Sequence, residues 1–297
     1  MVNISASRKI SLLVIHIFLA VFGLICIIPL IAVISISLSD EAEIVNSGYS
    51  LIPNKISTMA YDYIFQNPAQ IINSYKVSII VTVIGLTAGL LMTSMIAYTL
   101  SRRDFKYRNA LSIYVFITML FGGGLVPFYI LVKRYLHMDD KIWALIVPYL
   151  ISPWNILLLR TFFQKIPVEL IESAKIDGAR EFRIFFAMIL PLSKPALGTI
   201  GLFIALGYWN DWWLGLLFIN KAELLTLQVL LQRIMANIDF LKSNMINAVV
   251  DLSTLKNLPG ESARMAMCIL AAGPMLIMFP FFQKFFIKGL TIGSIKG

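Results

Sequence analysis

Six long apolar runs constrain this chain more than any other feature of its sequence. Each is about 20 residues or longer, the length that an α-helix needs to cross the hydrocarbon core of a bilayer. The predicted spans are residues 10–38, 74–100, 109–132, 142–163, 195–219 and 264–285. Within a membrane only helices and closed barrels satisfy their backbone hydrogen bonds. The predicted fold class is therefore an all-α polytopic membrane protein with six transmembrane helices.

Composition favours a membrane domain over a large soluble core. Of the 297 residues, 59% are hydrophobic and only 14% are charged, whereas an average soluble domain has about 25% charged residues. The first run is too long for a secretory signal and is expected to remain as a helix. Cys26 and Cys268 lie in apolar runs without metal-ligand spacing and are expected to be core residues. No internal repeat is visible, so residues 1–297 are expected to form a single transmembrane domain.

The distribution of Lys and Arg predicts the topology. One side of the membrane would hold both termini, the turn 101–108 and the segment 160–194. These parts contain 15 of the 25 Lys and Arg residues but only five of the 16 acids. Such an excess marks the cytoplasmic side, so both termini are expected there. The net charge of +9 then faces anionic lipid and cytoplasmic partners, and nucleic acid is not an expected partner. Residues 220–263 are expected outside, with a short helix at 224–234.

A polar segment on the predicted cytoplasmic side, residues 164–194, begins with a helical pattern. Pro167 suits the first position of a helix, because its missing N–H would have no intrahelical partner there. Val168, Ile171 and Ala174 recur at helical spacing and define one apolar face. The segment is therefore expected to start with an amphipathic helix.

A glycine separates this helix from a second helical run at 179–190. Gly178 lies where a helix commonly ends in a left-handed residue. The two runs carry a spaced set that resembles the EAA loop of ABC-importer permeases: Glu172, Ser173, Ala174, Gly178, Met188, Leu190 and Pro191. Ser173 and Met188 depart from the alanine and isoleucine of that family. Residues 164–194 are called the EAA-like loop below. The alternative is an ordinary amphipathic connector between two membrane helices.

The resemblance implies a cytoplasmic coupling helix that docks into a groove on a separate ATPase subunit. It assigns the coupling contact to Glu172, Ser173, Ala174, Asp177 and Gly178. Glu172 and Asp177 would bond to the ATPase, and Gly178 would aim the helix. ATP and Mg²⁺ would be bound by the ATPase subunits, and this chain contains no phosphate-loop motif. No catalytic residue, metal or cofactor is therefore expected in this chain.

Other stretches resemble the carbohydrate, or maltose-type, branch of these permeases, and most closely its polysaccharide and oligosaccharide importers of the alginate type. They are residues 101–104, 122–127, 143–146, 190–197 and 207–210. The resemblance implies a heterodimer with a second related permease, two cytoplasmic ATPase subunits and an extracytoplasmic solute-binding protein. The implied function is ATP-driven import of an oligo- or polysaccharide across the bacterial plasma membrane by alternating access. The sequence does not identify the sugar.

Three consecutive glycines interrupt the third predicted span. Gly122, Gly123 and Gly124 each weaken a helix by roughly 1 kcal/mol relative to alanine. One interpretation is a hinge or helix break that lines the transport path. The other is close helix–helix packing, for which small residues are favoured.

A polar and aromatic group lies in the fifth predicted span. Its candidates for the substrate path are Tyr208, Trp209, Asn210, Asp211 and Trp212, with Asn155 of the fourth span as a weaker one. Asp211 is the only acid well inside a predicted span. A central charge costs roughly 2.5–3.5 kcal/mol on insertion scales, so it should face the bundle interior or water. Aromatic faces beside amide and carboxylate groups suit a sugar, whereas an interfacial aromatic belt with a helix-end acid is the alternative.

Two other classes of membrane protein fit the sequence less well than an ATP-driven permease. An ion-coupled secondary transporter of a small polar solute predicts charged residues near the bilayer midplane and repeat symmetry, and neither is visible. A membrane enzyme would need clustered His, Asp or Ser residues, whereas the chain has two isolated histidines. The sequence therefore favours the ATP-driven permease.

Overall fold

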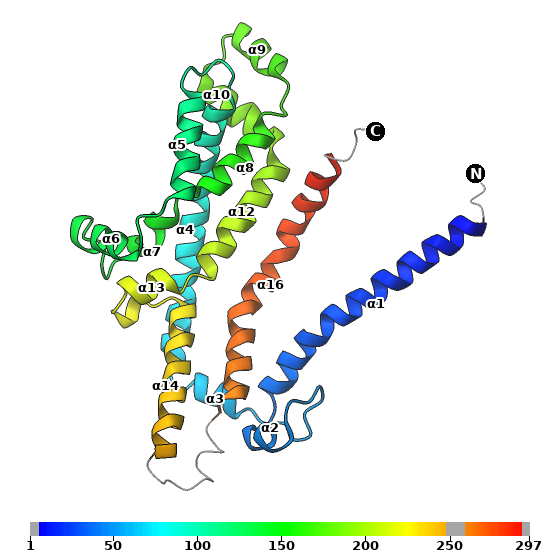
Figure 1. Ribbon diagram of the computed structural model, residues 1–297, viewed down its shortest axis with the longest axis vertical. Coiled ribbons are helices and arrows are strands. Elements are labelled where there is room, and N and C mark those ends of the chain that lie inside the picture. The colour runs from blue at the N-terminus through cyan, green and yellow to red at the C-terminus, as the bar shows by residue number, and fades with distance from the viewer. Residues whose placement is uncertain (1–5, 248–258, 293–297) are drawn as a thin grey trace. The chain divides into compact units, whose positions relative to one another are not determined.

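The computed structural model describes residues 6–247 and 259–292, and these residues are helical almost throughout (Figure 1). Parts of three helices are long and apolar enough to cross a membrane: α1 (Ala6–Ser37), α4 (Pro68–Ser101) and α16 (Glu261–Ile292). Three bent helix pairs raise this number to six if each pair counts as one span. The predicted all-α class agrees with this arrangement. The extreme ends of the chain, predicted to be cytoplasmic, lie outside the described residues.

The other elements are shorter than these three helices. They are α2 (Glu41–Ser47), α3 (Met59–Ile64), α5 (Arg108–Leu120), α6 (Leu125–Ile130), η1 (Leu131–Tyr135), α7 (Trp143–Ile146), η2 (Val147–Tyr149), α8 (Pro153–Phe163), α9 (Val168–Ile176), α10 (Glu181–Ile184), η3 (Phe185–Ile189), α11 (Leu190–Leu192), α12 (Lys194–Trp209), α13 (Trp213–Phe218), η4 (Ala222–Leu224) and α14 (Leu227–Asn247). The short helix expected at 224–234 is thus the 21-residue helix α14.

The bent pairs show where the chain departs from straight spans. The axis turns by 108° between α5 and the α6–η1 helix, and by 48° between the α7–η2 helix and α8. It turns by 85° between the helix 181–192 and the helix 194–218. The second break lies just before Pro153, the first residue of α8. Proline is suited to the first position of a helix, and the Ser152 side chain caps the helix that begins there.

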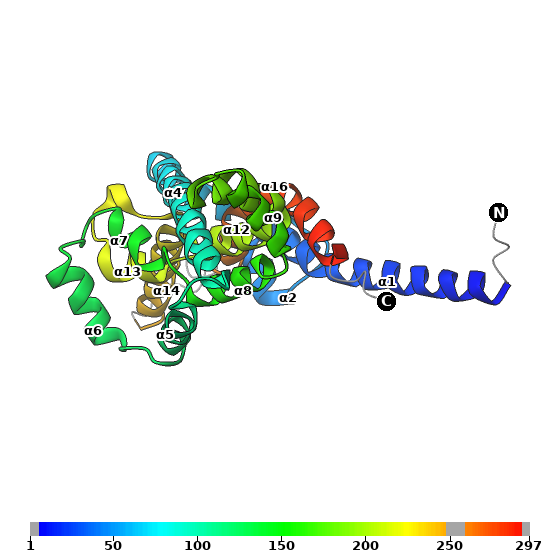
Figure 2. The ribbon, with the colours of Figure 1, turned by 90° about the horizontal axis from the view of Figure 1, so that it is seen from above.

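The chain divides into two compact units. Unit 1 comprises the residues up to Pro68 together with Leu231–Gly273, and unit 2 comprises Ala69–Leu230 together with the chain from Pro274. The EAA-like loop lies wholly within unit 2. In Figure 1, α9 lies at one end of this unit, beyond the ends of α4 and α5, and Figure 2 looks down on that end.

Unit 2 is built around α4, which meets its neighbours through small residues. Its buried face carries Ser74, Ser78, Gly85 and Gly89, which are spaced by one turn or two turns. At Gly85 an added Cβ would lie only 2.4 Å from the ring of Tyr208, so the contact requires glycine. The exposed side chains of α4 include Ile79, Ile80, Val83 and Ile84. This helix therefore makes part of its packing through small side chains and exposes several large apolar ones, as expected for helices surrounded by lipid.

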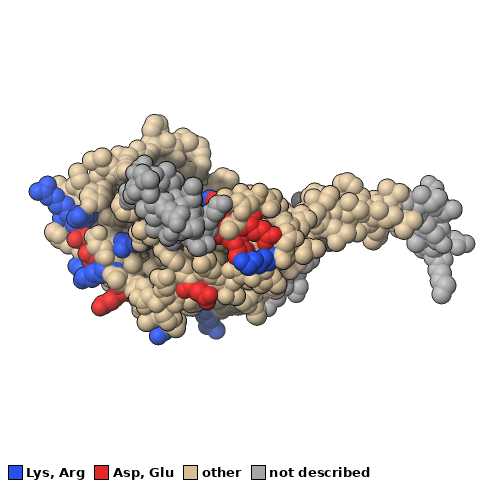
Figure 3. Space-filling model, turned by 90° about the horizontal axis from the view of Figure 1, so that it is seen from below, with Lys and Arg blue, Asp and Glu red and all other residues tan. Residues whose placement is uncertain are grey.

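The same exposure corrects the expectation for the two cysteines. Cys26 in α1 and Cys268 in α16 are both exposed, so the prediction that they are core residues was wrong. None of the most apolar window of α1 is buried within the chain. Figure 3 shows Lys, Arg, Asp and Glu in small separate groups on a surface that is otherwise uncharged. In a membrane protein an apolar side chain is as suited to lipid as to a core, so hydrophobicity alone does not indicate burial.

Unit 1 contains a buried carboxylate that caps α16. Glu41, the first residue of α2, is only 4% exposed. Its carboxylate accepts hydrogen bonds from the backbone N–H groups of Glu261 and Ser262, at 3.0 Å each, and from the Ser262 hydroxyl at 2.7 Å. The Lys242 ammonium donates a fourth bond at 3.1 Å. The first N–H groups of a helix have no partner within it, so Glu41 serves as a cap supplied from a distant part of the sequence.

These contacts set the ionisation of Glu41. Burial alone would raise the pKa of its carboxyl, but the hydrogen bonds from Ser262, Glu261 and Lys242 outweigh burial and hold the pKa below its ordinary value. A pKa that is lower in the folded state stabilises the fold at neutral pH. This stabilisation is lost as the pH falls below the unfolded value of about 4.3.

We expect Glu41→Ala to lower the free energy of unfolding by about 2 kcal/mol, because it leaves the first N–H groups of α16 without their partner. It also removes the ion pair with the partly exposed Lys242 ammonium. The measurement is the thermal unfolding midpoint of the purified protein in detergent, at pH 7 and at pH 3.5. The natural protein should lose more stability on acidification than the variant. The control is Glu43→Ala, which removes the more exposed hydrogen bonds to Asn54 and the Lys55 N–H. An equal decrease in the unfolding midpoint of Glu41→Ala and Glu43→Ala at pH 7 would refute the capping role of Glu41.

Candidate functional site

The turn of the EAA-like loop is a two-bond helix cap. The Ala179 N–H donates to the Ala174 carbonyl at 2.9 Å, and the Gly178 N–H donates to the Lys175 carbonyl at 3.0 Å. This pair of bonds is the Schellman motif, which needs a left-handed residue after the helix. Gly178 supplies it with φ +79°. The predicted left-handed glycine is confirmed, although α9 starts at Val168, one residue after Pro167.

Helix α9 has two distinct faces. Ile171 and Ala174 are buried against unit 2. At 100° per residue, the opposite face carries Glu169, Glu172, Ser173 and Ile176, all of them exposed. Ile176 is 87% exposed, an unusual position for so apolar a side chain. Val168 was expected on the buried face but is 43% exposed, so that expectation was wrong for the first turn of α9.

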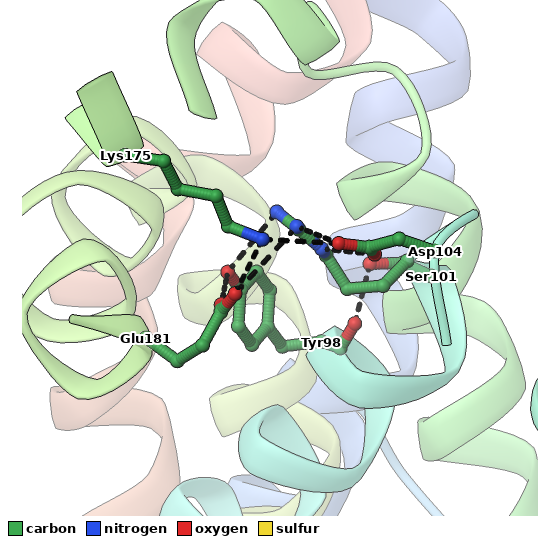
Figure 4. Close-up of polar contacts among 6 residues, drawn as sticks. Tyr98, Ser101, Asp104, Lys175 and Glu181 are labelled. Carbon is green, nitrogen blue, oxygen red and sulfur yellow. Dashed lines mark hydrogen bonds and ion pairs between the residues drawn. The ribbon is translucent and has the colours of Figure 1, made fainter. Parts of the chain in front are cut away.

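A network of charged side chains ties α9 to the rest of unit 2 (Figure 4). The Lys175 ammonium lies 3.0 Å from an Asp104 carboxylate oxygen and 2.8 Å from a Glu181 carboxylate oxygen. The guanidinium of Arg102 donates two hydrogen bonds to Asp104. The Tyr98 hydroxyl donates to Glu181 at 2.9 Å. These five residues, called the loop network below, come from the end of α4, the turn after it, α9 and α10.

The loop network fixes the charge state of its members. Hydrogen bonds from Arg102, and then from Lys175, hold the pKa of the Asp104 carboxyl well below its usual range. The bonds of Lys175 to Glu181 and Asp104 raise the pKa of its ammonium. Both groups are therefore charged throughout the physiological pH range. Because two cations lie against two carboxylates, the network is neutral as a whole.

The acids predicted for the coupling contact lie outside this network. Glu172 and Asp177 are exposed, and in the described part of the chain neither makes an ion pair. The Ser173 hydroxyl donates to the Leu170 carbonyl at 3.1 Å, and Ala174 is buried. Lys175, between these residues, faces the unit. The loop thus pairs its inward charges and leaves its outward acids free beside Ile176.

The predicted interruption at the three glycines is present. Residues 121–124 separate α5 from α6, and Gly124 has φ +84°. An added Cβ at Gly122, Gly123 or Gly124 would have no atom of the described chain within 4 Å. Within these residues the helix break is therefore supported, and close packing around the glycines is not observed.

The polar and aromatic group of the fifth predicted span lies at a second helix break. Helix α12 ends at Trp209 and α13 begins at Trp213. Asp211 accepts a hydrogen bond from the Leu214 N–H at 3.2 Å and so caps α13. Asn210 is exposed, and its side-chain amide donates to the Leu206 carbonyl at 3.0 Å.

The aromatic residues of this group differ in how far their side chains are exposed. Tyr208 and Trp209 are buried, and the Tyr208 hydroxyl donates to the Ile146 carbonyl at 2.8 Å. Trp212 is exposed and packs edge-to-face on Trp213, with ring centroids 5.5 Å apart. Asn155 is buried in the first turn of α8. Of the predicted path residues, Asn210 and Trp212 are therefore the most accessible in this structure.

Comparison with known proteins decides between the classes of function that the sequence left open. Residues 89–292, which include the whole loop, match the family described as binding-protein-dependent transport system inner membrane component. This chain belongs to that family. It is a transport permease of the inner membrane, and the expectation of an ABC permease is confirmed over that of an ion-coupled secondary transporter.

Relatives of the permease match along nearly its full length. The polygalacturonan/rhamnogalacturonan transport system permease protein YtcP of Bacillus subtilis (strain 168) is 42% identical over 280 residues, which cover 94% of this chain and 96% of that protein. Protein LplC of the same strain is 40% identical, with 94% and 92% covered. A solved bacterial ABC transporter involved in the import of the acidic polysaccharide alginate matches with a TM-score of 0.75 and 27% identity, over 95% of this chain and 98% of that one.

Sequence reasoning did not find the loop network of the permease. It singled out the 101–104 stretch as part of a resemblance and counted Asp104 and Glu181 as acids of one side. The contact between them depends on Lys175, which is 71 residues from Asp104 and only six from Glu181. The available signal was the alternation of positive and negative charge among Arg102, Asp104, Lys175 and Glu181. This alternation does not show which of the residues form ion pairs with one another.

We expect Asp104→Asn and Lys175→Met to be coupled in a double-mutant cycle by about 0.5–1 kcal/mol, the size typical of partly exposed ion pairs. The measurement is the thermal unfolding of the purified permease in detergent. Asp177→Asn is the matched control, because residues two apart on a helix do not face each other. Its effect should simply add to that of Lys175→Met. If the effects of Asp104→Asn and Lys175→Met on stability were also additive, the loop network would contribute nothing to fixing α9.

Proposed function

We propose that this permease is the translocation subunit of an ATP-driven importer of oligo- or polysaccharides that works by alternating access. The single observation that carries the mechanism is the geometry of α9. Its inner face is fixed to unit 2 by apolar contacts and by the loop network, while its outer face presents Ile176 and unpaired acids. A helix of this kind is suited to transmit movement from a docked partner into the membrane helices.

The proposed partners follow from the family. They are a second, related permease that completes a heterodimer, two cytoplasmic ATPase subunits and an extracytoplasmic solute-binding protein. ATP and Mg²⁺ bind to the ATPase subunits, and this chain binds no cofactor of its own. The excess of Lys and Arg supports a topology with both termini and the EAA-like loop in the cytoplasm.

In this mechanism α9 docks into a groove of the ATPase. Ile176 fills an apolar part of the groove, and Glu172 and Asp177 make charge-assisted hydrogen bonds at its edge. When ATP closes the ATPase dimer, α9 moves with its groove. The loop network passes this movement to the end of α4, and the helix break at Gly122–Gly124 serves as a hinge.

A saccharide is supported by the relatives. YtcP is described as a permease for polygalacturonan and rhamnogalacturonan, and the matching solved transporter imports alginate. We place the sugar beside Asn210 and Trp212, where an amide and an exposed aromatic face are available. Tyr208, Trp209 and Asn155 support this site from the buried side, and Asp211 holds the helix break in place.

We expect Ile176→Asp to reduce transport by roughly tenfold, within the usual range of coupling energies, while the complex retains basal ATP hydrolysis. The reason is that a charge replaces the apolar contact with the ATPase, whereas so exposed a side chain contributes little to folding. Gly178→Val should have the same effect, because φ +79° strains a β-branched residue.

Uptake and ATP hydrolysis would both be measured in vesicles that contain the complete complex. Ile52→Asp is the matched control, since Ile52 is 77% exposed but belongs to unit 1. Uptake at the natural level in Ile176→Asp and Gly178→Val would refute the coupling role of α9.

The substrate class is tested by stimulation of ATP hydrolysis. We expect the assembled complex with its solute-binding protein to respond to oligosaccharides from galacturonan, rhamnogalacturonan or alginate. Amino acids and short peptides should give no response, because they lack sugar rings, in which several hydroxyl groups surround a face that stacks on an aromatic side chain. Stimulation by peptides and by none of the saccharides would overturn the assignment, and Trp212→Ala should weaken the saccharide response.

A further inference from the structure

An apolar groove lies between the last turns of α4 and the first turns of α5. It has a volume of about 370 Å³ and is lined by Met95, Ile96, Thr99, Leu100, Leu111, Tyr114 and Val115. The Thr99 hydroxyl donates to the Met95 carbonyl at 3.0 Å, so its bonding capacity is largely used within α4. Leu100 forms a buried part of the wall, whereas Leu111 and Tyr114 are exposed. A groove with these walls suits a hydrocarbon chain.

Cationic side chains lie at the end of this groove. The turn that joins α4 to α5 contains Arg103 and Lys106, both exposed, and α5 begins with Arg108. Arg108 lies on the same helical face as Leu111 and Val115, three and seven residues away. These spacings correspond to about 4.5 and 10.5 Å along the axis. Arg108 is therefore within one to two helical turns of the apolar walls, and Arg103 and Lys106 precede it in the turn between α4 and α5.

These cations are not neutralised by the protein. Asp104 is the only acid in the turn, and its carboxylate is occupied by Arg102 and Lys175 of the loop network. Among the described residues, no ion pair involves Arg103, Lys106 or Arg108; Lys106 lies 5.6 Å from the centre of the Tyr107 ring. Three positive charges thus remain beside the groove.

We propose that this groove binds an anionic phospholipid of the cytoplasmic leaflet. One acyl chain lies between α4 and α5, and the phosphate contacts Arg103, Lys106 and Arg108. Basic side chains next to a membrane-spanning helix attract anionic headgroups, and an adjoining apolar groove adds the specificity that a charged surface alone lacks. The bound lipid would lie against the same end of α4 that carries the loop network. The leaflet follows from the proposed topology, whereas the groove and its charges do not depend on it.

The experiment measures lipid retention by the purified permease. The protein is exchanged into detergent micelles with equal amounts of phosphatidylglycerol and phosphatidylcholine, and bound lipid is counted by native mass spectrometry. We expect the natural protein to retain phosphatidylglycerol preferentially. The triple variant Arg103→Gln, Lys106→Gln, Arg108→Gln should reduce that preference by about tenfold or more. Leu111→Trp, which fills the groove but keeps the charges, should also reduce it.

The matched control removes three cations that do not line the groove. They are exchanged in the variant Arg180→Gln, Arg183→Gln, Lys194→Gln, which should retain phosphatidylglycerol as the natural protein does. Equal retention by the natural protein and the groove triple variant would overturn the proposal, as would an unchanged preference in Leu111→Trp. In the assembled complex, loss of the second permease from either groove variant, while that variant still retains phosphatidylglycerol, would identify the groove as a protein interface and would also overturn the proposal. Lipid retention is measured without transport. A negative result would therefore overturn the lipid site and leave the proposed function untouched.

Discussion

The absence of water from the hydrocarbon core is the constraint on which this structure depends. Every backbone N–H and C=O there must be bonded within the protein, so each helix break needs a partner for its free groups. In unit 2 that partner is often a side chain. Asp211 caps α13 within the fifth predicted span. Side chains also serve free backbone groups at the predicted outer ends of the spans: Ser78 accepts the Leu227 N–H at 2.8 Å, and Asp140 accepts the N–H groups of Asn220 and Lys221. Polar side chains and helix breaks therefore occur together.

This constraint gives Asp211 a structural role that is independent of any substrate. An acid inside an apolar segment is costly, but a carboxylate that bonds the first N–H groups of a helix recovers part of that cost. The break that it stabilises also leaves Asn210 and Trp212 exposed. The proposed sugar contacts and the capped break are thus two consequences of one local geometry, in which irregular backbone exposes side chains that a continuous helix would not.

Outside the hydrocarbon region, the EAA-like loop follows the rules of a soluble surface. Its position relative to α4 is set by ion pairs among Lys175, Asp104 and Glu181 and by the burial of Ile171. Single ion pairs at a surface contribute little to stability, but a network that shares its members orders several side chains together. The loop can therefore remain attached to α4 while Ile176 stays available to a partner.

The all-α class, the glycine turn at Gly178 and the break at the three glycines could be predicted from the sequence, because each depends on local chain properties. The sequence also carried the family resemblance. The tertiary structure decided the rest. Contact of Lys175 with Asp104, capping of α16 by Glu41 and burial of Tyr208 against Gly85 join residues far apart in the chain. In membrane helices that are apolar on every face, hydrophobicity does not show which face meets lipid, and only the packing determines it.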